Sequence, residues 1–337
     1  MSDGDGARAE DVDLARLSDL ITPMAVRTAA TLRLGDHMAE GRRTPEELAE
    51  AAGADPDALG RVLEHLVQVG LAERDGQGRY DLVGEGERLR SEHPRSVRAF
   101  LSVEHPVTRA DLAFVHLPRS VRTGSASFPE QYGRGFWEDL AAAPERSAVF
   151  DAQMSSDVST VAPDIAAACA WGRLGSLADV GGGDGTLLIE LLRAHPGLRG
   201  AVVDLAPAAE RARARLAEAG LADRATGLAG DFFGELPVGY GGYLLCAVVH
   251  DWDRSSAVAI LRRCAEAAGP SGRVFIAERT GEDGESPDTW MNLRMLVYFG
   301  GKDRGVTELV ELAGEAGLDL VAAHPAGRMS VIELRPR

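Results

Sequence analysis

The segment around His250 places an imidazole, two carboxylates and an indole directly after an apolar run. Residues 244–249 read LLCAVV, and His250, Asp251, Trp252 and Asp253 follow. Because imidazole has a pKa of about 6.5, it can accept a proton from an acidic hydroxyl group near neutral pH. The same residues could instead form a polar plug at the end of a strand. The elements around them must distinguish a general base from a structural histidine.

The composition is that of a soluble protein of about two domains. The chain has 337 residues, 52 of them acidic and 36 basic, with a net charge of −16. This balance argues against nucleic acid as the main partner, because phosphates require a basic surface. The acidic N-terminus has no apolar signal-peptide core, and no run approaches the roughly 18 apolar residues of a membrane span. We therefore expect a cytoplasmic protein with no membrane partner.

Three scattered cysteines are too few for a disulfide framework or a zinc site. No group of His, Asp and Glu stands at metal-ligand spacing, so we expect no metal. Residues 1–10 are expected to form a disordered tail. Between residues 12 and 40, apolar residues at helical spacing predict two helices. The second is apolar over much of its surface and needs a partner, either the rest of the chain or a second subunit.

Within residues 11–95 the pattern is that of a winged helix. Thr44 and Glu47 can form a capping box for a helix that starts at Pro45. A longer helix and two short strands, which end at Leu82, come next. A winged helix often binds DNA through its second helix.

That second helix carries Arg61 between the acidic Asp57 and Glu64. A helix that reads DNA would present basic and amide groups instead. The composition therefore favours a dimerisation module over a DNA-binding one, although a winged-helix regulator that senses a small molecule stays open as an alternative.

Residues 96–160 are predicted to be helices and loops without a sheet, and we interpret them as a linker that roofs a pocket. From residue 161 to 337, apolar runs alternate with helical stretches. This alternation predicts an α/β fold with a Rossmann-like, doubly wound, mostly parallel sheet. Ligands of such sheets bind outside the carboxyl ends of the strands, and His250 is predicted at one of these ends.

The first strand runs into the glycine-rich segment DVGGGDG, residues 179–185, and a helix is predicted from Thr186. Glycines let the backbone turn tightly and approach a ligand. The dinucleotide fingerprint G-x-G-x-x-G is not met, because its last position is Thr186, and Asp184 would place a negative charge near a pyrophosphate. The pattern D-x-G-x-G-x-G, with Gly181 and Gly183, favours S-adenosylmethionine over NAD(P).

Two further strand ends fit the same cofactor. Asp204, 19 positions after Gly185, can accept hydrogen bonds from both ribose hydroxyls, and Leu205 can pack on the adenine. The third strand leads into GDFF, where Asp231 can accept from the adenine amino group and Phe232 can flank the ring. Together the three segments predict a methyl donor beside His250. The histidine would then take a phenolic proton, held by a carboxylate such as Glu278 or Asp303.

The chain resembles the small-molecule O-methyltransferases of the plant caffeic acid type and their actinobacterial relatives. DVGGGDG, VVDL, GDFF, HDWD and GGKDR occur in the family's order. ITPMAVRTAATLRLGDHM, YGRGFWEDL and FDAQMS are closest to the anthracycline-tailoring branch, which contains carminomycin O-methyltransferase and aclacinomycin 10-hydroxylase. The resemblance covers the chain from about Leu14 to the C-terminus.

The resemblance implies a class I methyltransferase domain, a homodimer formed through the N-terminal domain, and an aromatic polyketide substrate. It implies that Gly181, Asp204, Asp231 and Phe232 hold the cofactor and that Cys246 contacts it. It also makes His250 the general base, flanked by Glu278 and by Asp303, which stands where the plant enzymes have glutamate. The implied acceptor site consists of Trp137, Met154, Asp251, Arg294, Met295 and Tyr298.

One departure from the anthracycline branch bears on the chemistry. The two members named above have Leu-Asn-Trp where this chain has His250, Asp251 and Trp252. One of them uses the cofactor for decarboxylative hydroxylation. The histidine therefore favours O-methylation of a phenolic hydroxyl on an anthraquinone-like or anthracycline-like polyketide, yielding S-adenosylhomocysteine. A cofactor-assisted hydroxylase or decarboxylase is the alternative.

Overall fold

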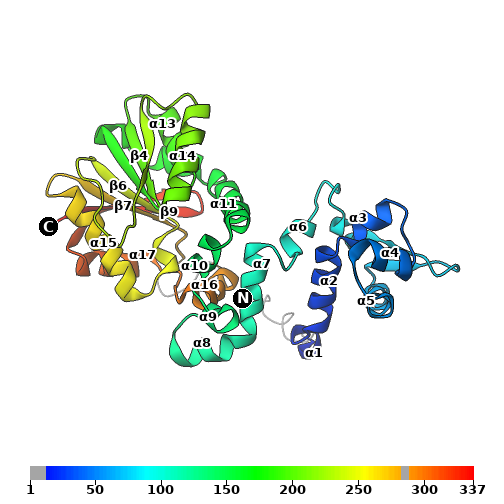
Figure 1. Cartoon of the computed structure of the whole chain (residues 1–337). Coiled ribbons are helices and arrows are strands. Elements are labelled where there is room, and N and C mark those ends of the chain that lie inside the picture. The colour runs from blue at the N-terminus through cyan, green and yellow to red at the C-terminus, as the bar shows by residue number, and fades with distance from the viewer. Residues whose placement is uncertain (1–12, 282–287) are drawn as a thin grey trace, which may run out of the picture. The chain divides into compact units, whose positions relative to one another are not determined.

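Separate hydrophobic cores divide the chain into two units, residues 1–109 and 110–337. The computed structural model describes residues 13–281 and 288–337 (Figure 1). The predicted tail at residues 1–10 lies outside the described residues. The division falls inside the segment 96–160, which the sequence analysis treats as a linker.

Unit 1 is helical with a two-stranded antiparallel wing, as the sequence predicts. Its elements are α1 (Leu14–Leu17), α2 (Ile21–Thr31), α3 (Leu34–Ala39), α4 (Pro45–Ala52), α5 (Pro56–Gln68), β1 (Ala72–Arg74), β2 (Tyr80–Leu82), η1 (Gly84–Leu89) and α6 (Arg98–Leu101). The helix α7 (Pro106–Asp111) spans the division between the units.

Local capping explains where these helices begin. The predicted capping box is present: Thr44 Oγ1 accepts from the Glu47 amide at 3.3 Å, and the Glu47 carboxylate accepts from the Thr44 amide at 3.0 Å. The prediction of two helices between residues 12 and 40 was wrong, since there are three. Arg33 adopts the left-handed conformation, with φ of 54°, and this separates α2 from α3.

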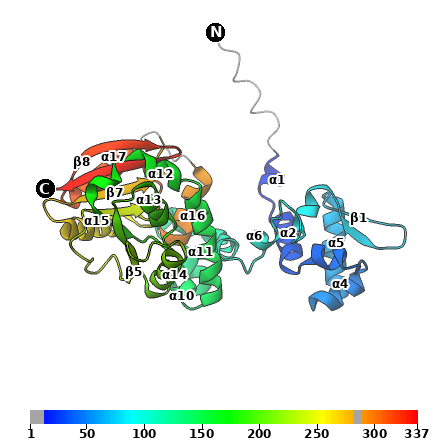
Figure 2. The ribbon, with the colours of Figure 1, turned by 90° about the horizontal axis from the view of Figure 1, so that it is seen from above.

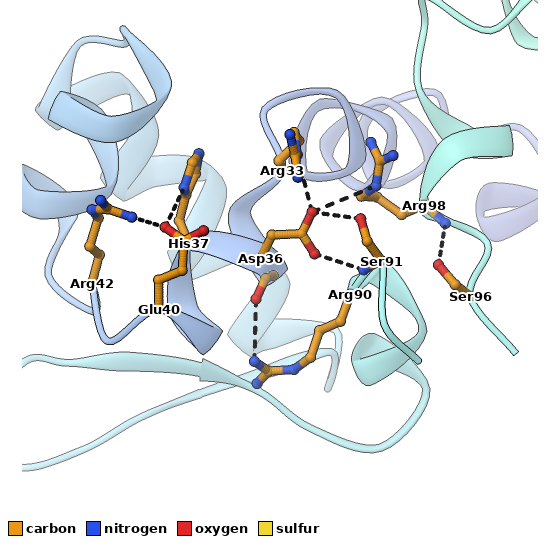
Figure 3. A network of polar contacts seen from close by, with 10 residues as sticks. Arg33, Asp36, His37, Glu40, Arg42, Arg90, Ser91, Ser96 and Arg98 are labelled. Carbon is orange, nitrogen blue, oxygen red and sulfur yellow. Dashed lines mark hydrogen bonds and ion pairs between the residues drawn. The ribbon is translucent and has the colours of Figure 1, made fainter. Parts of the chain in front are cut away.

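A network of arginines and acids ties α3 to the segment that follows the wing. The carboxylate of Asp36 accepts from the amide and the hydroxyl of Ser91, both at 2.7 Å, and from Arg33 at 3.1 Å (Figure 3). Arg90 donates to the carbonyl of Gly35 at 3.2 Å. These arginines therefore stabilise unit 1 internally.

Unit 2 contains a seven-stranded sheet in the order β5-β4-β3-β6-β7-β9-β8. The first five of these strands are parallel, and β9 is antiparallel to both neighbours. The strands are β3 (Ser176–Val180), β4 (Arg199–Asp204), β5 (Ala225–Ala229), β6 (Gly242–Cys246), β7 (Arg273–Glu278), β8 (Leu318–Ala326) and β9 (Met329–Pro336). The chain order reverses between β3 and β6, and open sheets of this kind bind ligands at the carboxyl ends of the strands at such a point.

Both faces of the sheet are buried, which explains why its strands read as continuous apolar runs. Leu177 and Leu244 point into one core, and their neighbours Ala178 and Leu245 point into the other. The helices on the two faces can be followed in Figures 1 and 2. The first core includes α12 (Ala162–Ala168), η3 (Trp171–Leu174), α13 (Thr186–Ala194) and α14 (Ala206–Glu218), and the second includes α15 (Arg254–Ala268) and α17 (Val306–Glu315).

The remaining helices of unit 2 gather an aromatic cluster. Phe136 lies at ring-centroid distances of 4.9 to 5.9 Å from Phe299, Phe150 and Tyr298. The elements are η2 (Leu112–His116), α8 (Leu117–Thr123), α9 (Phe128–Tyr132), α10 (Phe136–Ala141), α11 (Pro144–Ser159) and α16 (Thr289–Phe299). Across residues 13–281 and 288–337, no helix is both long and apolar enough to cross a membrane.

Candidate active site

The glycine loop between β3 and α13 is shaped for close approach. Gly181, Gly183 and Gly185 have φ values of 73°, 59° and 82°, a conformation that strains other residues. A Cβ on Gly181 would lie 2.9 Å from Val248 Cγ2 and 3.5 Å from the ring of Phe232. At Gly181 there is therefore no space for a side chain between the loop and the segments that carry Val248 and Phe232.

The ends of β4 and β5 reach the same loop. Asp204 accepts hydrogen bonds from the amides of Gly183, at 2.9 Å, and Leu205, at 2.7 Å. Burial raises the pKa of Asp204, although these amide bonds oppose the effect. Leu205 is exposed. Asp231 accepts from the amide of Phe233 at 2.9 Å.

The structure thus brings Gly181, Gly183, Asp204 and Phe232 together, and it places Asp231 and Leu205 at the two flanking strand ends. Cys246, the last residue of β6, is half-buried, and burial raises the pKa of its thiol well above the usual value. A protonated thiol at this position is a small, weakly polar contact surface.

A buried carboxylate lies below the loop. Asp179 is completely buried, and neither of its carboxylate oxygens has a hydrogen-bond partner. Burial, together with the negative charges of Asp204 and Asp184, raises the pKa of Asp179 to about 7. The sequence analysis used Asp179 only as part of the motif and missed this feature, because burial is not visible in a motif.

These residues fit S-adenosylmethionine rather than a pyrophosphate. The acids around the loop suit a ligand that carries an ammonium and a sulfonium group, and they would repel two phosphates. The close approach at Gly181 gives a narrow cradle for the adenosyl and methionyl parts. No group of three or more His, Cys, Asp and Glu in the described ranges could hold a metal ion.

The strand that precedes His250 is shorter than the sequence suggests. The apolar run continues to Val249, but β6 ends at Cys246. Ala247 has a φ of 53°, which is unfavourable for alanine and turns the chain out of the sheet. His250 therefore lies in a one-turn 3-10 helix, η4 (Val249–Asp251), rather than at the strand end itself.

Glu278, the last residue of β7, holds this turn with both carboxylate oxygens. Its Oε2 lies 2.6 Å from His250 Nδ1, and its Oε1 accepts from the amides of Val249, at 2.9 Å, and His250, at 3.2 Å. A carboxylate at Nδ1 favours the tautomer with the proton on that nitrogen. His250 Nε2 is then the basic atom of the ring.

A second carboxylate lies at that basic atom. Asp251 Oδ1 is 3.3 Å from His250 Nε2. Burial lowers the pKa of His250, but the charges of Glu278 and Asp251 outweigh it, so the pKa stands well above its usual value. The imidazole keeps 22% of its side-chain surface exposed. It is thus reachable by a ligand while being held from two sides.

Asp303, the second predicted flanking acid, lies in the segment that follows α16. Its amide donates to Asn292 at 3.1 Å, and its side chain is buried. Burial raises the pKa of Asp251, and the charges of Glu278 and Asp303 add to that effect. Glu278 is the carboxylate that the structure places on the Nδ1 atom, and the charge of Asp303 acts on Asp251 beside it.

Of the predicted acceptor residues, Trp137 and Tyr298 belong to the aromatic cluster, and Met154, Arg294 and Met295 lie on helices that contribute rings to it. Trp137 stacks on Phe299 at 5.4 Å and is 36% exposed. Met154, on α11, has the same exposed fraction, whereas Met295 is buried. The exposed edge of this cluster offers flat apolar surface to a ligand.

Arg294 and Tyr298 meet on an acid that the sequence analysis missed. Arg294 donates to both oxygens of Asp111 at 3.0 Å, and the Tyr298 hydroxyl donates to the same carboxylate. Asp111 stands 183 positions before Arg294 in the chain, so no local pattern could have identified it. The pair fixes α16, which carries Arg294, Met295 and Tyr298.

The chain belongs to the O-methyltransferase family and is an S-adenosylmethionine-dependent methyltransferase. Residues 114–319 match the O-methyltransferase domain, and residues 15–86 match the O-methyltransferase dimerisation domain. The fold, a class I methyltransferase sheet preceded by a helical dimerisation domain, is confirmed by these matches and by solved relatives.

Individual relatives are similar over nearly their whole length. The 2,7-dihydroxy-5-methyl-1-naphthoate 7-O-methyltransferase of Streptomyces carzinostaticus is 52% identical, over 98% of this chain and 99% of that protein. Aclacinomycin 10-hydroxylase RdmB of Streptomyces purpurascens is 43% identical, over 94% and 86%. A crystal structure of the O-methyltransferase NcsB1 from neocarzinostatin biosynthesis, with S-adenosyl-L-homocysteine and 1,4-dihydroxy-2-naphthoic acid, superimposes with a TM-score of 0.90 at 51% identity, over 98% and 100%.

The buried Asp179 predicts a pH-dependent stability of the ligand-free protein. Because its pKa is about 7 when folded and about 3.9 when unfolded, the folded state binds the extra proton between these values. Stability should therefore fall as pH rises from about 4 to 7. Asp179→Asn removes this loss, so its gain in stability over the native protein should be about a third as large at pH 5 as at pH 8, where it should be on the order of a few kcal/mol.

Urea unfolding followed by tryptophan fluorescence measures this effect in unit 2, because all four tryptophans lie there. Asp223→Asn, which changes an exposed acid of the same unit, is the matched control and should show no such pH dependence. An equal effect of Asp179→Asn at pH 5 and pH 8 would show that the carboxyl is not titrating in this range.

Proposed function

We propose that the protein methylates a phenolic hydroxyl of an aromatic polyketide, with His250 as the general base. The single observation that carries this proposal is the 2.6 Å contact between Glu278 and His250 Nδ1, which orients the ring and leaves Nε2, 3.3 Å from Asp251 Oδ1, as the nitrogen that can take a proton. Support for the substrate class comes from the relatives. One is named a dihydroxynaphthoate 7-O-methyltransferase, and a solved relative holds a hydroxynaphthoic acid.

The relatives favour a bicyclic hydroxynaphthoate-type acceptor over the larger anthraquinone-like or anthracycline-like ring systems that the sequence analysis named. Both are phenols, so both satisfy the same chemistry. We propose that the size of the accepted ring system depends on how much flat apolar surface the site offers. Trp137 and Met154, which are both partly exposed, would contribute to that surface. We assign Arg294, Met295 and Tyr298 to the same acceptor site.

In the proposed reaction the imidazole moves one proton. S-adenosylmethionine, when bound, supplies a methyl group already activated on a sulfonium. His250 Nε2 would take the proton of the acceptor hydroxyl as the oxygen bonds to the methyl carbon, whose bond to sulfur breaks so that S-adenosylhomocysteine leaves. Glu278 stabilises the imidazolium, and Asp251, at 3.3 Å from Nε2, is positioned to contact the same hydroxyl.

For the cofactor we propose the following division of roles. Gly181 and Gly183 let the backbone approach the methionyl part, and Asp204 takes the ribose hydroxyls. Leu205, Asp231 and Phe232 surround the adenine, and Cys246 contacts the cofactor from β6. We propose that the cofactor site lies in the segment 161–337, with its roof supplied by the part of the segment 96–160 that belongs to unit 2, from residue 110 onward.

A second candidate function is supported by one relative. Aclacinomycin 10-hydroxylase RdmB is 43% identical to this chain. A cofactor-assisted hydroxylation or decarboxylation of a similar aromatic polyketide is therefore the alternative, and it would give a different product from the same incubation.

We also propose that residues 11–95 form a homodimer interface. Four large apolar side chains at the start of unit 1 are strongly exposed: Leu14, Leu17, Leu20 and Ile21. Exposed apolar side chains in such a group are typical of an interaction surface, and this segment belongs largely to the matched dimerisation domain.

The catalytic proposal predicts the outcome of one incubation series. The native protein, His250→Ala and His250→Gln receive S-adenosylmethionine with either a dihydroxynaphthoic acid or a dihydroxyanthraquinone. Mass spectrometry should show a product heavier by one methyl group, and kcat should fall about 10²–10⁴-fold in both variants. Unchanged kcat in both variants would show that His250 has a structural role and is not the general base. A hydroxylated or decarboxylated product would establish the alternative function.

The dimer proposal predicts a mass change on charging the apolar surface. Light scattering should give the native protein twice the chain mass of 35.7 kDa. Leu17→Glu combined with Ile21→Glu should shift it toward the monomer, because charged side chains resist burial. Val238→Glu, which charges an exposed apolar residue of unit 2, is the control and should stay dimeric. A native monomer would refute the interface.

A further inference from the structure

The main chain of the turn that carries His250 is held from two opposite directions. On the amide side, Glu278 accepts from the N–H groups of Val249 and His250. On the carbonyl side, Arg304 donates to Val249 at 2.9 Å and to Trp252 at 2.8 Å. One carboxylate and one guanidinium therefore fix a turn of four residues.

The segment that brings Arg304 to the turn packs directly against it. The amide of Lys302 donates to the carbonyl of His250 at 2.8 Å. A Cβ added to Gly301 would lie 2.2 Å from that same carbonyl oxygen. Residues 301–304 and the turn therefore leave no space for the catalytic residue to shift on this side.

The burial of the Arg304 guanidinium carries a desolvation penalty. The residue is only 5% exposed, and the carboxylate that pairs with it, that of Glu308, lies 3.7 Å from Nε. Taking a cation out of water with so distant a counter-charge is unfavourable, and an apolar side chain of similar volume would pack at lower cost. What the guanidinium adds is a rigid fork of donors that spans two carbonyls three residues apart.

We propose that Arg304 is a positioning residue for His250. It acts through the carbonyls of Val249 and Trp252, and it keeps the imidazole at its short distance from Glu278. This inference rests on the proposed role of His250 as the general base. It concerns a residue that the sequence analysis quoted in GGKDR without assigning it a role.

The test compares Arg304→Lys and Arg304→Gln with the native protein, each also in a His250→Ala background. Neither lysine nor glutamine can bridge two carbonyls with a rigid fork, so kcat should fall on the order of 10–100-fold. The affinity for S-adenosylhomocysteine, measured by calorimetry, should stay within about twofold of the native value. The reason is that the substitutions are expected to disturb the position of His250 and not the contacts that bind the cofactor product. The acid limb of the pH profile of kcat/KM should move to lower pH as the ring loses Glu278.

In the His250→Ala background, the same substitutions at Arg304 should change kcat less than about twofold, because residues that act as a unit are not additive. Arg254→Lys, an exposed arginine at the start of α15, is the matched control and should leave kcat unchanged in both backgrounds. Two variants are used so that misfolding of one does not decide the result.

A full loss of kcat in the His250→Ala background, or an unmoved pH profile, would overturn the role of Arg304. So would a parallel loss of S-adenosylhomocysteine affinity, which would indicate general damage to the fold. If His250→Ala alone leaves kcat unchanged, the proposed base has failed. The single and double variants therefore distinguish two outcomes: that His250 is not the general base, and that Arg304 does not position it.

Discussion

The carboxylate of Glu278 is the group on which the geometry of the site depends. One oxygen takes the amides of Val249 and His250, and the other lies 2.6 Å from the imidazole. A single side chain thus fixes both the backbone that carries the ring and the orientation of the ring. Because Glu278 is the last residue of a central strand with buried neighbours on both faces, its own position is rigid.

The order of the strands in the sheet brings the turn that carries His250 close to the glycine loop. β3 and β6 lie side by side where the chain order reverses, so the glycine loop and the His250 turn emerge at the same edge. Gly181 packs on Val248, one residue before the turn, and Phe232 lies against the same glycine. In the proposed function, a cofactor bound by the loop would therefore lie beside the turn that carries His250.

Much of this arrangement could be predicted from the sequence, because it depends on local rules. Residues that are close together in the sequence determine three of its features: the alternation of strands and helices, the positions of the glycines and the capping box at Thr44. The end of β6 could not be predicted, since the apolar run continues through Val249 while the break is a left-handed alanine at 247. Asp111 and the burial of Asp179 depend on contacts between distant segments and leave no local signal.

The carboxylate of Glu278 should hold the pKa of the His250 imidazole above its usual value. NMR titration of this imidazole in the ligand-free protein measures the pKa directly, with His250→Gln to assign the resonance. We expect a pKa above the usual value of about 6.5 in the native protein and a lower pKa in Glu278→Gln, where one of the two negative charges is gone. A His250 pKa at or below about 6.5 that is unchanged in Glu278→Gln would contradict it.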